Sequence, residues 1–156
     1  GTILLISFIT ALFEKPINIV IEFWFQHKRF FKILNEELNF PAGLKENLKI
    51  PYQLYSLRYD KLKFIIRGIF DTDGSFYIGK NSKGMRTCPC ISLHMKEPVL
   101  LKQIADILKK ERFSFYFDEP NYQIKLRGKK QLEKWMKEIG FSNPKHLNKI
   151  NSFFAG

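Results

Sequence analysis

The sequence predicts a mixed α/β fold in which helices cover one face of a four-stranded antiparallel sheet. Three observations predict it. Segments with a helical hydrophobic period alternate with short segments whose apolar residues alternate singly. Over residues 58–150 these segments follow the order αββαββα. Finally, 156 residues, 45% of them hydrophobic, can bury one good core or two small ones.

Each element of this unit has its own signal. The first helix is expected from about Asp60 to Thr72. The Asn81–Gly84 turn has the residues that favour a hairpin. A proline at position 98 is tolerated in the first turn of a helix. The remaining expectations are strands over 75–80 and 87–95, a helix from Pro98, a second hairpin over 113–117 and 122–126, and a last helix over 129–139.

A faint internal repeat sets the domain boundaries. Residues 21–40 read as a strand that leads into a helix, and residues 122–141 repeat this pattern with apolar positions in register. We therefore expect residues 1–57 to be the ββα rear half of a first module plus a connector, and residues 58–156 to be a complete module. Chance similarity between two strand–helix units is the alternative.

Composition favours a polyanionic partner. The chain has 26 basic and 15 acidic residues, a formal net charge of +11. Nucleic acid is the simplest such partner, because phosphate contacts dominate its affinity for proteins. A basic surface with no binding role is the alternative.

Cysteine usage and hydropathy suggest an intracellular protein without a membrane span. The two cysteines, Cys88 and Cys90, lack zinc-finger spacing, and both fall on one face of a strand, where packing in the core is expected. The apolar residues 2–13 are too few to cross a bilayer. We expect a cytoplasmic or nucleoid-associated location.

The most informative segment is residues 64–76, Phe-Ile-Ile-Arg-Gly-Ile-Phe-Asp-Thr-Asp-Gly-Ser-Phe. It places Asp71 and Asp73 at the C-terminal end of an apolar helix, where the helix dipole disfavours negative charge. A hard cation such as Mg²⁺ would relieve this conflict. A simple helix cap, for which Asp and Gly are ordinary residues, is the alternative.

Residues 66–74 resemble the signature motif of the LAGLIDADG homing endonucleases. Ser75 and Phe76 often follow that motif, and residues 140–147, Gly-Phe-Ser-Asn-Pro-Lys-His-Leu, resemble a closing stretch of the family. Arg67 and Thr72 depart from the eponymous spelling. The resemblance extends over roughly residues 58–150, and it is specific through this combination.

The resemblance implies a metal-dependent nuclease that acts on double-stranded DNA. In the family, two modules pair through their motif helices, which here would involve Gly68, Ile69 and Thr72. The last acid of the motif, Asp73, would hold Mg²⁺ together with the carbonyl of Thr72, while Asp71 would cap or buttress the helix end. Lys96 and Lys125 compete for the position of a lysine near the water and phosphate, and for each a plain phosphate contact is the alternative.

Strand alternation predicts which side chains face a nucleic acid. One face of an antiparallel sheet stays free when helices cover the other, and Lys, Arg and Gln on it could contact phosphates and bases. A solvated polar face is the alternative. The residues expected to contact DNA are Ser75, Tyr77, Lys80, Lys83, Arg86, Gln123, Lys125 and Arg127.

Only one motif is present, whereas the chemistry implied by the family needs two carboxylates. Three interpretations stay open. The module could form a homodimer through its motif helix, the chain could be the rear part of a two-motif enzyme that cuts poorly, or it could be a non-catalytic DNA- or RNA-binding relative such as a splicing maturase or a regulator. An intron, an intein and a free-standing gene are all compatible origins.

Overall fold

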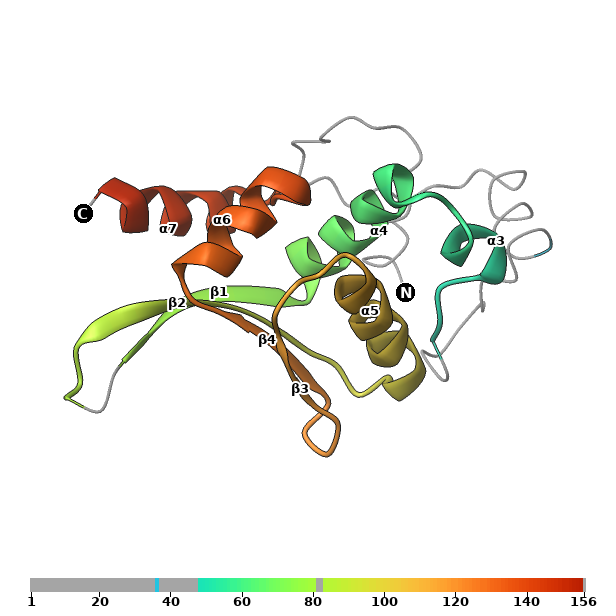
Figure 1. Ribbon diagram of the computed structural model, residues 1–156, viewed down its shortest axis with the longest axis horizontal. Coiled ribbons are helices and arrows are strands. Elements are labelled where there is room, and N and C mark those ends of the chain that lie inside the picture. The colour runs from blue at the N-terminus through green and yellow to red at the C-terminus, as the bar shows by residue number, and fades with distance from the viewer. Residues whose placement is uncertain (1–35, 37–47, 81–82, 156) are drawn as a thin grey trace, which may run out of the picture.

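The computed structural model describes residues 36, 48–80 and 83–155. Figure 1 shows a helical layer above a twisted sheet, with the turn between β1 and β2 at one end of the molecule. The elements, in chain order, are α3 (Tyr52–Tyr55), α4 (Tyr59–Thr72), β1 (Gly74–Lys80), β2 (Arg86–His94), α5 (Pro98–Lys110), β3 (Tyr116–Asp118), β4 (Gln123–Arg127), α6 (Lys129–Glu138) and α7 (Pro144–Ala155).

The sheet is antiparallel throughout, with strand order β1-β2-β4-β3. This confirms the predicted class, a mixed α/β fold with a four-stranded antiparallel sheet flanked by helices. The predicted ββα half module of residues 1–57 falls almost wholly outside the described residues, so the domain division stays a prediction. The 12-residue helix α7, after the predicted unit, was not expected from the sequence.

One face of the sheet forms the core. Helices α4, α5, α6 and α7 all contact the sheet. The strands contribute every second residue to this face, and at the centre of the helical layer Trp135 is fully buried beside Phe70, with ring centroids 4.5 Å apart. The buried sheet residues on this face are Phe76, Ile91, Leu93, Ile124 and Leu126.

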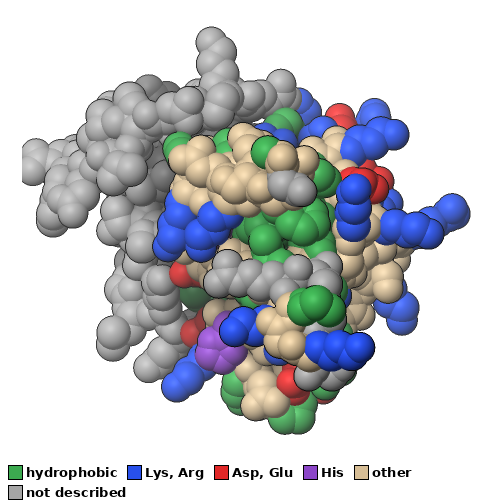
Figure 2. Space-filling model, turned by 90° about the vertical axis from the view of Figure 1, so that its left-hand side faces the viewer, with side chains coloured by type: hydrophobic (Ala, Val, Ile, Leu, Met, Phe, Trp, Pro, Cys, Tyr) green, Lys and Arg blue, Asp and Glu red, His purple; other side chains and the backbone are tan. Residues whose placement is uncertain are grey.

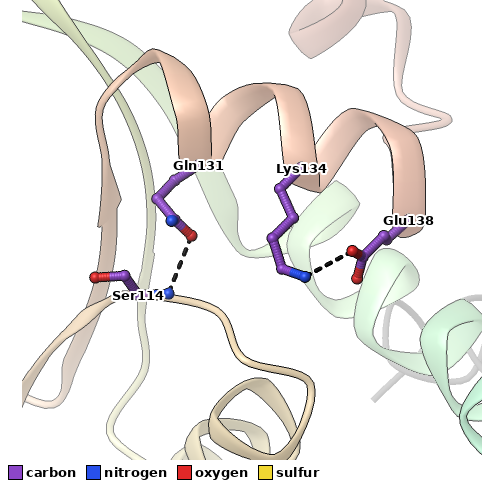
Figure 3. A network of polar contacts seen from close by, with 4 residues as sticks. All are labelled: Ser114, Gln131, Lys134 and Glu138. Carbon is purple, nitrogen blue, oxygen red and sulfur yellow. Dashed lines mark hydrogen bonds and ion pairs between the residues drawn. The ribbon is translucent and has the colours of Figure 1, made fainter.

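The second hairpin begins later than predicted, at Tyr116 rather than Phe113. The Phe113 N–H donates to the carbonyl of Leu108, and the Ser114 N–H donates to Oε1 of Gln131 on α6 (Figure 3). These two N–H groups are therefore unable to join a strand ladder. The Phe113 ring instead enters the core beside Trp135.

The end of the predicted connector docks on α5. The Leu48 N–H donates to a carboxylate oxygen of Glu97, and Gln103 both accepts from the Ile50 N–H and donates to its carbonyl. Ile50 is 1% exposed. Within residues 48–80 and 83–155, no helix has the length and apolar composition needed to cross a membrane.

Candidate nucleic-acid interface and metal site

Helix α4 ends with Asp73 exposed at its C-terminal cap. The Thr72 hydroxyl is 3.1 Å from the carbonyls of Gly68 and Ile69, which fixes the last turn, and it lies 3.4 Å from Oδ2 of Asp73. The chain then turns directly into β1 at Gly74. A Cβ at Gly74 would lie 2.4 Å from the Phe70 carbonyl oxygen, so this turn requires glycine. Asp73 is thus presented to solvent at a fixed corner between helix and sheet.

Asp71 lies on the other side of α4 and is held by the turn between α6 and α7. Its carboxylate accepts from the N–H groups of Ser142 (3.0 and 3.1 Å) and Asn143 (3.1 Å), and the Asn143 amide donates to the Asp71 carbonyl (2.8 Å). Burial raises the pKa of Asp71, while these hydrogen bonds and Arg67 act in the opposite direction. Asp71 therefore buttresses the helix end, as the sequence suggested.

Arg67 is the second contact between α4 and that turn. Its Nε donates to the carbonyl of Ile139, and its guanidinium lies 3.6 Å from the position a Cβ would take at Gly140, where φ is +73°. Burial lowers the pKa of Arg67, and the charge of Asp71 opposes this. Arg67 therefore ties α4 to the α6–α7 turn.

The sheet face opposite the core carries polar and aromatic side chains, and we call it the outer face. Strand alternation places Ser75, Tyr77, Gln123, Lys125 and Arg127 there, on the face predicted for them. Cross-strand register arranges the outer face in four rows: Gly79–Cys88, Tyr77–Cys90–Arg127, Ser75–Ser92–Lys125–Tyr116 and His94–Gln123–Asp118.

Strand β2 contributes the small side chains of Cys90 and Ser92 to these rows. The Ser75 and Ser92 hydroxyls are 2.8 Å apart. A side-chain hydrogen bond with Cys90, followed by burial, raises the pKa of Tyr77, and the charge of Arg127 opposes this. Cys90 is 2% exposed, but its thiol is on the outer face and not among the core side chains where it was expected. Both cysteines are free.

The outer face contains one acid, Asp118 of β3. Its two carboxylate oxygens accept from the backbone N–H and the side-chain amide of Asn121, at 3.2 and 2.9 Å. Both carboxylate oxygens of Asp118 are therefore used in hydrogen bonds that stabilise the β3–β4 hairpin. Lys125 and Arg127 show no ion pair within the described residues, so the positive charge of β4 is not neutralised there.

The remaining basic candidates lie around the sheet edges. Lys80 is exposed at the end of β1, Lys83 is exposed in the hairpin turn, and Lys96 is exposed just beyond β2. Arg86 begins β2, but its side chain is not among those described. Strand alternation alone does not bring Lys96 into the outer-face rows, whereas it places Lys125 at their centre.

The predicted helix interface is mostly interior. Gly68 is buried and Ile69 is 0% exposed within this chain, while Thr72 is exposed. Pairing with a second copy through these residues stays a prediction.

The oxygen donors at the end of α4 suit a hard cation but are few. The Asp73 carboxylate is exposed, and the Thr72 carbonyl belongs to the last turn, where carbonyls have no partner within the helix. In residues 48–80 and 83–155, no three His, Cys, Asp or Glu side chains come together as a metal cluster would require. The donors fit Mg²⁺ in kind, and further ligands have to come from elsewhere.

Three outer-face residues were not predicted from the sequence: Ser92, His94 and Tyr116. Applying the same alternation to β2 and β3 would have found them, since Ile91 and Leu93 mark the core face of β2. The partners of Asp71 could not be found this way, because they lie 71 and 72 residues along the chain.

No family model matches the sequence, and no curated protein matches it. Among solved structures, the chain is similar to the crystal structure of the I-LtrWI LAGLIDADG homing endonuclease bound to target DNA, with a TM-score of 0.42 and 17% sequence identity. The likeness covers 94% of this chain and 53% of that one, so this chain spans about half of its length. It concerns the arrangement of helices and strands.

Proposed function

We propose that this protein binds double-stranded DNA on the outer face of its sheet. The observation that carries this proposal is the row arrangement itself: Lys125, Arg127 and Gln123 face outward on one strand, beside exposed Ser75 and Tyr77. Lysine and arginine neutralise phosphates, and arginine and glutamine can make paired hydrogen bonds to base edges in the major groove.

The proposal extends to metal-dependent hydrolysis of the DNA backbone, which would make the protein a site-specific endonuclease of the homing type. Asp73 would hold a divalent cation, Mg²⁺, with help from the Thr72 carbonyl. When bound, the metal would stabilise charge on the phosphodiester and lower the pKa of an attacking water. The chain's own part is to fix Asp73 at the corner between α4 and β1, next to the outer face.

A lysine near that corner would assist by holding a phosphate or a proton. Lys125 is the better candidate, because it shares a row with Ser75, two residues after Asp73. Lys96 is exposed beyond the end of β2 and is the second candidate. Lys80, Lys83 and Arg86 would add phosphate contacts at the β1–β2 end of the sheet.

The second carboxylate must come from another source. A second copy of the chain, paired through the motif helices, is the simplest, and it suits a DNA site with two-fold symmetry. A catalytically impaired DNA- or RNA-binding relative, such as a splicing maturase or a regulator, is the alternative function. Its support is that, among the described residues, the end of α4 presents one exposed carboxylate, that of Asp73, and no cluster of three metal-ligating side chains accompanies it. Either function would be intracellular.

The test is the pair of variants Asp73→Asn and Asp106→Asn. Asp106 is an exposed acid on α5 and serves as the matched control. We expect wild-type protein and the Asp106 variant to cut members of a random duplex library when Mg²⁺ is added. The Asp73 variant should bind duplex with nearly unchanged affinity and cut at least about 100-fold more slowly. Mutating a residue that only hydrogen-bonds to a metal ligand often lowers activity by about 10–100-fold, and the loss of a ligand itself should cost at least as much.

The outcomes separate the candidate functions. Binding without Mg²⁺-dependent cutting by wild type supports the non-catalytic relative. Equal cutting by wild type and the Asp73 variant removes Asp73 from the reaction. A clear fall in duplex affinity in Lys125→Gln/Arg127→Gln, with unchanged folding, is required for the outer face to be a binding surface.

A further inference from the structure

We propose a second nucleic-acid-binding surface on the helical hairpin α6–α7, which would take the phosphate backbone of a second DNA duplex. It goes beyond the sheet-face function because it uses other residues on the opposite layer of the molecule. We call it the helical lysine surface and define it by Lys129, Lys130, Lys137, Lys145 and Lys149.

The charge of this hairpin is strongly one-sided. Residues 129–155 contain six lysines and two glutamates. One of each is neutralised in the Lys134–Glu138 ion pair, 2.6 Å long, which Figure 3 shows on α6. The five lysines that remain are all exposed, and none forms an ion pair within the described residues. Glu133 is the one acid left among them.

The hairpin is rigid enough to hold these charges in place. The start of α6 lies near the end of α7, because Lys129 Nζ is 6.0 Å from the centre of the Phe154 ring. The turn at the other end is bonded to Asp71 and Arg67 of α4. The two helices are therefore packed antiparallel, with lysines near both ends of the pair.

Two of the lysines on α6 point away from the sheet. Helix α6 buries Leu132 and Trp135 against the core, and at 100° per residue Lys130 and Lys137 lie on the opposite side of the helix. Figure 1 shows α6 and α7 in the layer on the other side of the sheet from the outer face. In Figure 2, which looks at one end of the molecule, Lys and Arg side chains project from both layers, with apolar side chains between them.

Three of these lysines lie at the N-terminal ends of helices, where a positive charge is electrostatically unfavourable. Lys129 and Lys130 occupy the first turn of α6, Lys145 occupies the first turn of α7, and neither first turn contains an acid. The helix dipole is positive at these ends and repels cations. A row of phosphates would remove this repulsion, and it would gain the counterion release that drives sequence-independent binding.

Two basic surfaces on opposite layers would allow one molecule to hold two duplex segments. The outer face would bind one through base and phosphate contacts, and the helical lysine surface would bind another through phosphates only. Lysine ammonium groups make phosphate contacts without fixed geometry, so this second contact would be independent of sequence.

The test compares two variants that each lose four positive charges. The first is Lys130→Gln/Lys137→Gln/Lys145→Gln/Lys149→Gln. The matched control, Lys102→Gln/Lys109→Gln/Lys110→Gln/Arg112→Gln, removes four exposed basic residues on and just after α5. A third variant, Lys125→Gln/Arg127→Gln, removes the outer-face charges. Circular dichroism and thermal melting check that all three fold.

Two measurements decide the outcome. The first is the affinity for a random 30-base-pair duplex across a series of KCl concentrations. For this measurement, each set of four substitutions is introduced into the outer-face variant, so that only the remaining surface contributes to binding. We expect the four α6–α7 substitutions to lower the slope of log K against log salt by about 3–4, and the control to change it by less than about 1. The second is bridging, in which a bead-bound duplex captures a free fluorescent duplex through the protein.

Bridging by wild type and the α5 control, and its loss in both the helical and the outer-face variants, is the expected result. Equal slopes in the helical variant and the control overturn the proposal. The proposal is also overturned if the four helical lysines are needed for binding to phosphatidylserine vesicles but make no difference to binding of duplex. If the outer-face variant loses all duplex binding and the helical variant keeps wild-type affinity, the sheet-face function stands and the second surface does not.

Discussion

Asp71 and Asp73 are two residues apart at the end of α4, and the structure gives them opposite surroundings. Asp71 faces the helical layer, where its carboxylate accepts from two backbone N–H groups of the α6–α7 turn. Asp73 is exposed on the sheet side, with the Thr72 hydroxyl 3.4 Å away. Two residues turn a helix by about 200°, so neighbours of this spacing face opposite ways.

This difference leaves one of the two acids bonded within the chain and the other open to solvent. The oxygens of Asp71 are used inside the chain, which fixes the end of α4 against the α6–α7 turn. Those of Asp73 are available to a ligand, at a helix end where the dipole makes an unpaired carboxylate unfavourable. Exchanging or removing each acid should therefore have contrasting effects on stability and on function.

The largest effect on stability is expected from Asp71→Ala. It leaves two partly buried N–H groups, those of Ser142 and Asn143, without an acceptor, which should lower the free energy of unfolding by about 2–4 kcal/mol. Asp71→Asn keeps one acceptor oxygen and should lose about half as much. Urea unfolding measures both. Equal stability of Asp71→Ala and Asp106→Ala would show that the contact with the turn contributes nothing.

A smaller loss is expected from Gly74→Ala, which changes the corner on the Asp73 side. The new Cβ would lie 2.4 Å from the Phe70 carbonyl oxygen, and backbone atoms must shift to make room. Overpacking of this kind costs about 1–3 kcal/mol. Gly79→Ala, where the nearest atom is 3.3 Å away, is the matched control. If the two variants unfold at the same urea concentration, the corner is less tightly built than we describe.

The sequence predicted the sheet and its helices because period and turn residues are local properties. The α4, β1 and α6 segments carry clear periodicity, and each begins within one residue of its prediction. The strand predicted over Phe113–Phe115 was wrong for two reasons. The Phe113 N–H closes the end of α5 by donating to the Leu108 carbonyl, and the Ser114 N–H donates to Gln131, which reaches it only through tertiary packing. Helix α7 (Pro144–Ala155) was not predicted.

For the candidate site, local sequence patterns predicted which side chains of the strands face outward and that Asp73 is exposed at the end of its helix. Lys125 and Arg127 follow from alternation on one strand, which needs no tertiary information. The neighbours of Asp71, by contrast, depend on how α4 packs against a turn some 70 residues later.

A pH-dependent effect is expected on the Asp71 side of the molecule. His146 is 4% exposed and packs on the Phe141 ring, and burial, followed by the charges of Lys145 and Lys149, lowers its pKa, while a backbone hydrogen bond with Asp71 opposes this. A lowered pKa in the folded state means that the unfolded chain binds more protons below about pH 6.5.

The stability that neutral His146 contributes is therefore complete above pH 6.5 and is lost as the pH falls toward its folded pKa. Wild type should lose more free energy of unfolding between pH 7 and pH 5 than His146→Leu does. Urea unfolding at each pH gives this difference. Parallel pH profiles for the two proteins would show that His146 titrates in the same way whether the chain is folded or unfolded.

The smallest effect, and the one with the opposite sign, is expected from Asp73→Asn. Removing a carboxylate from the C-terminal cap of α4 relieves repulsion by the helix dipole, so the free energy of unfolding should rise by about 0.3–1 kcal/mol at low salt and by less at high salt. Mg²⁺ should stabilise wild type and leave the variant unchanged, because a ligand stabilises only the state that binds it. A variant less stable than wild type would mean that Asp73 supports the fold as Asp71 does, and the division of roles between the two acids would then fail.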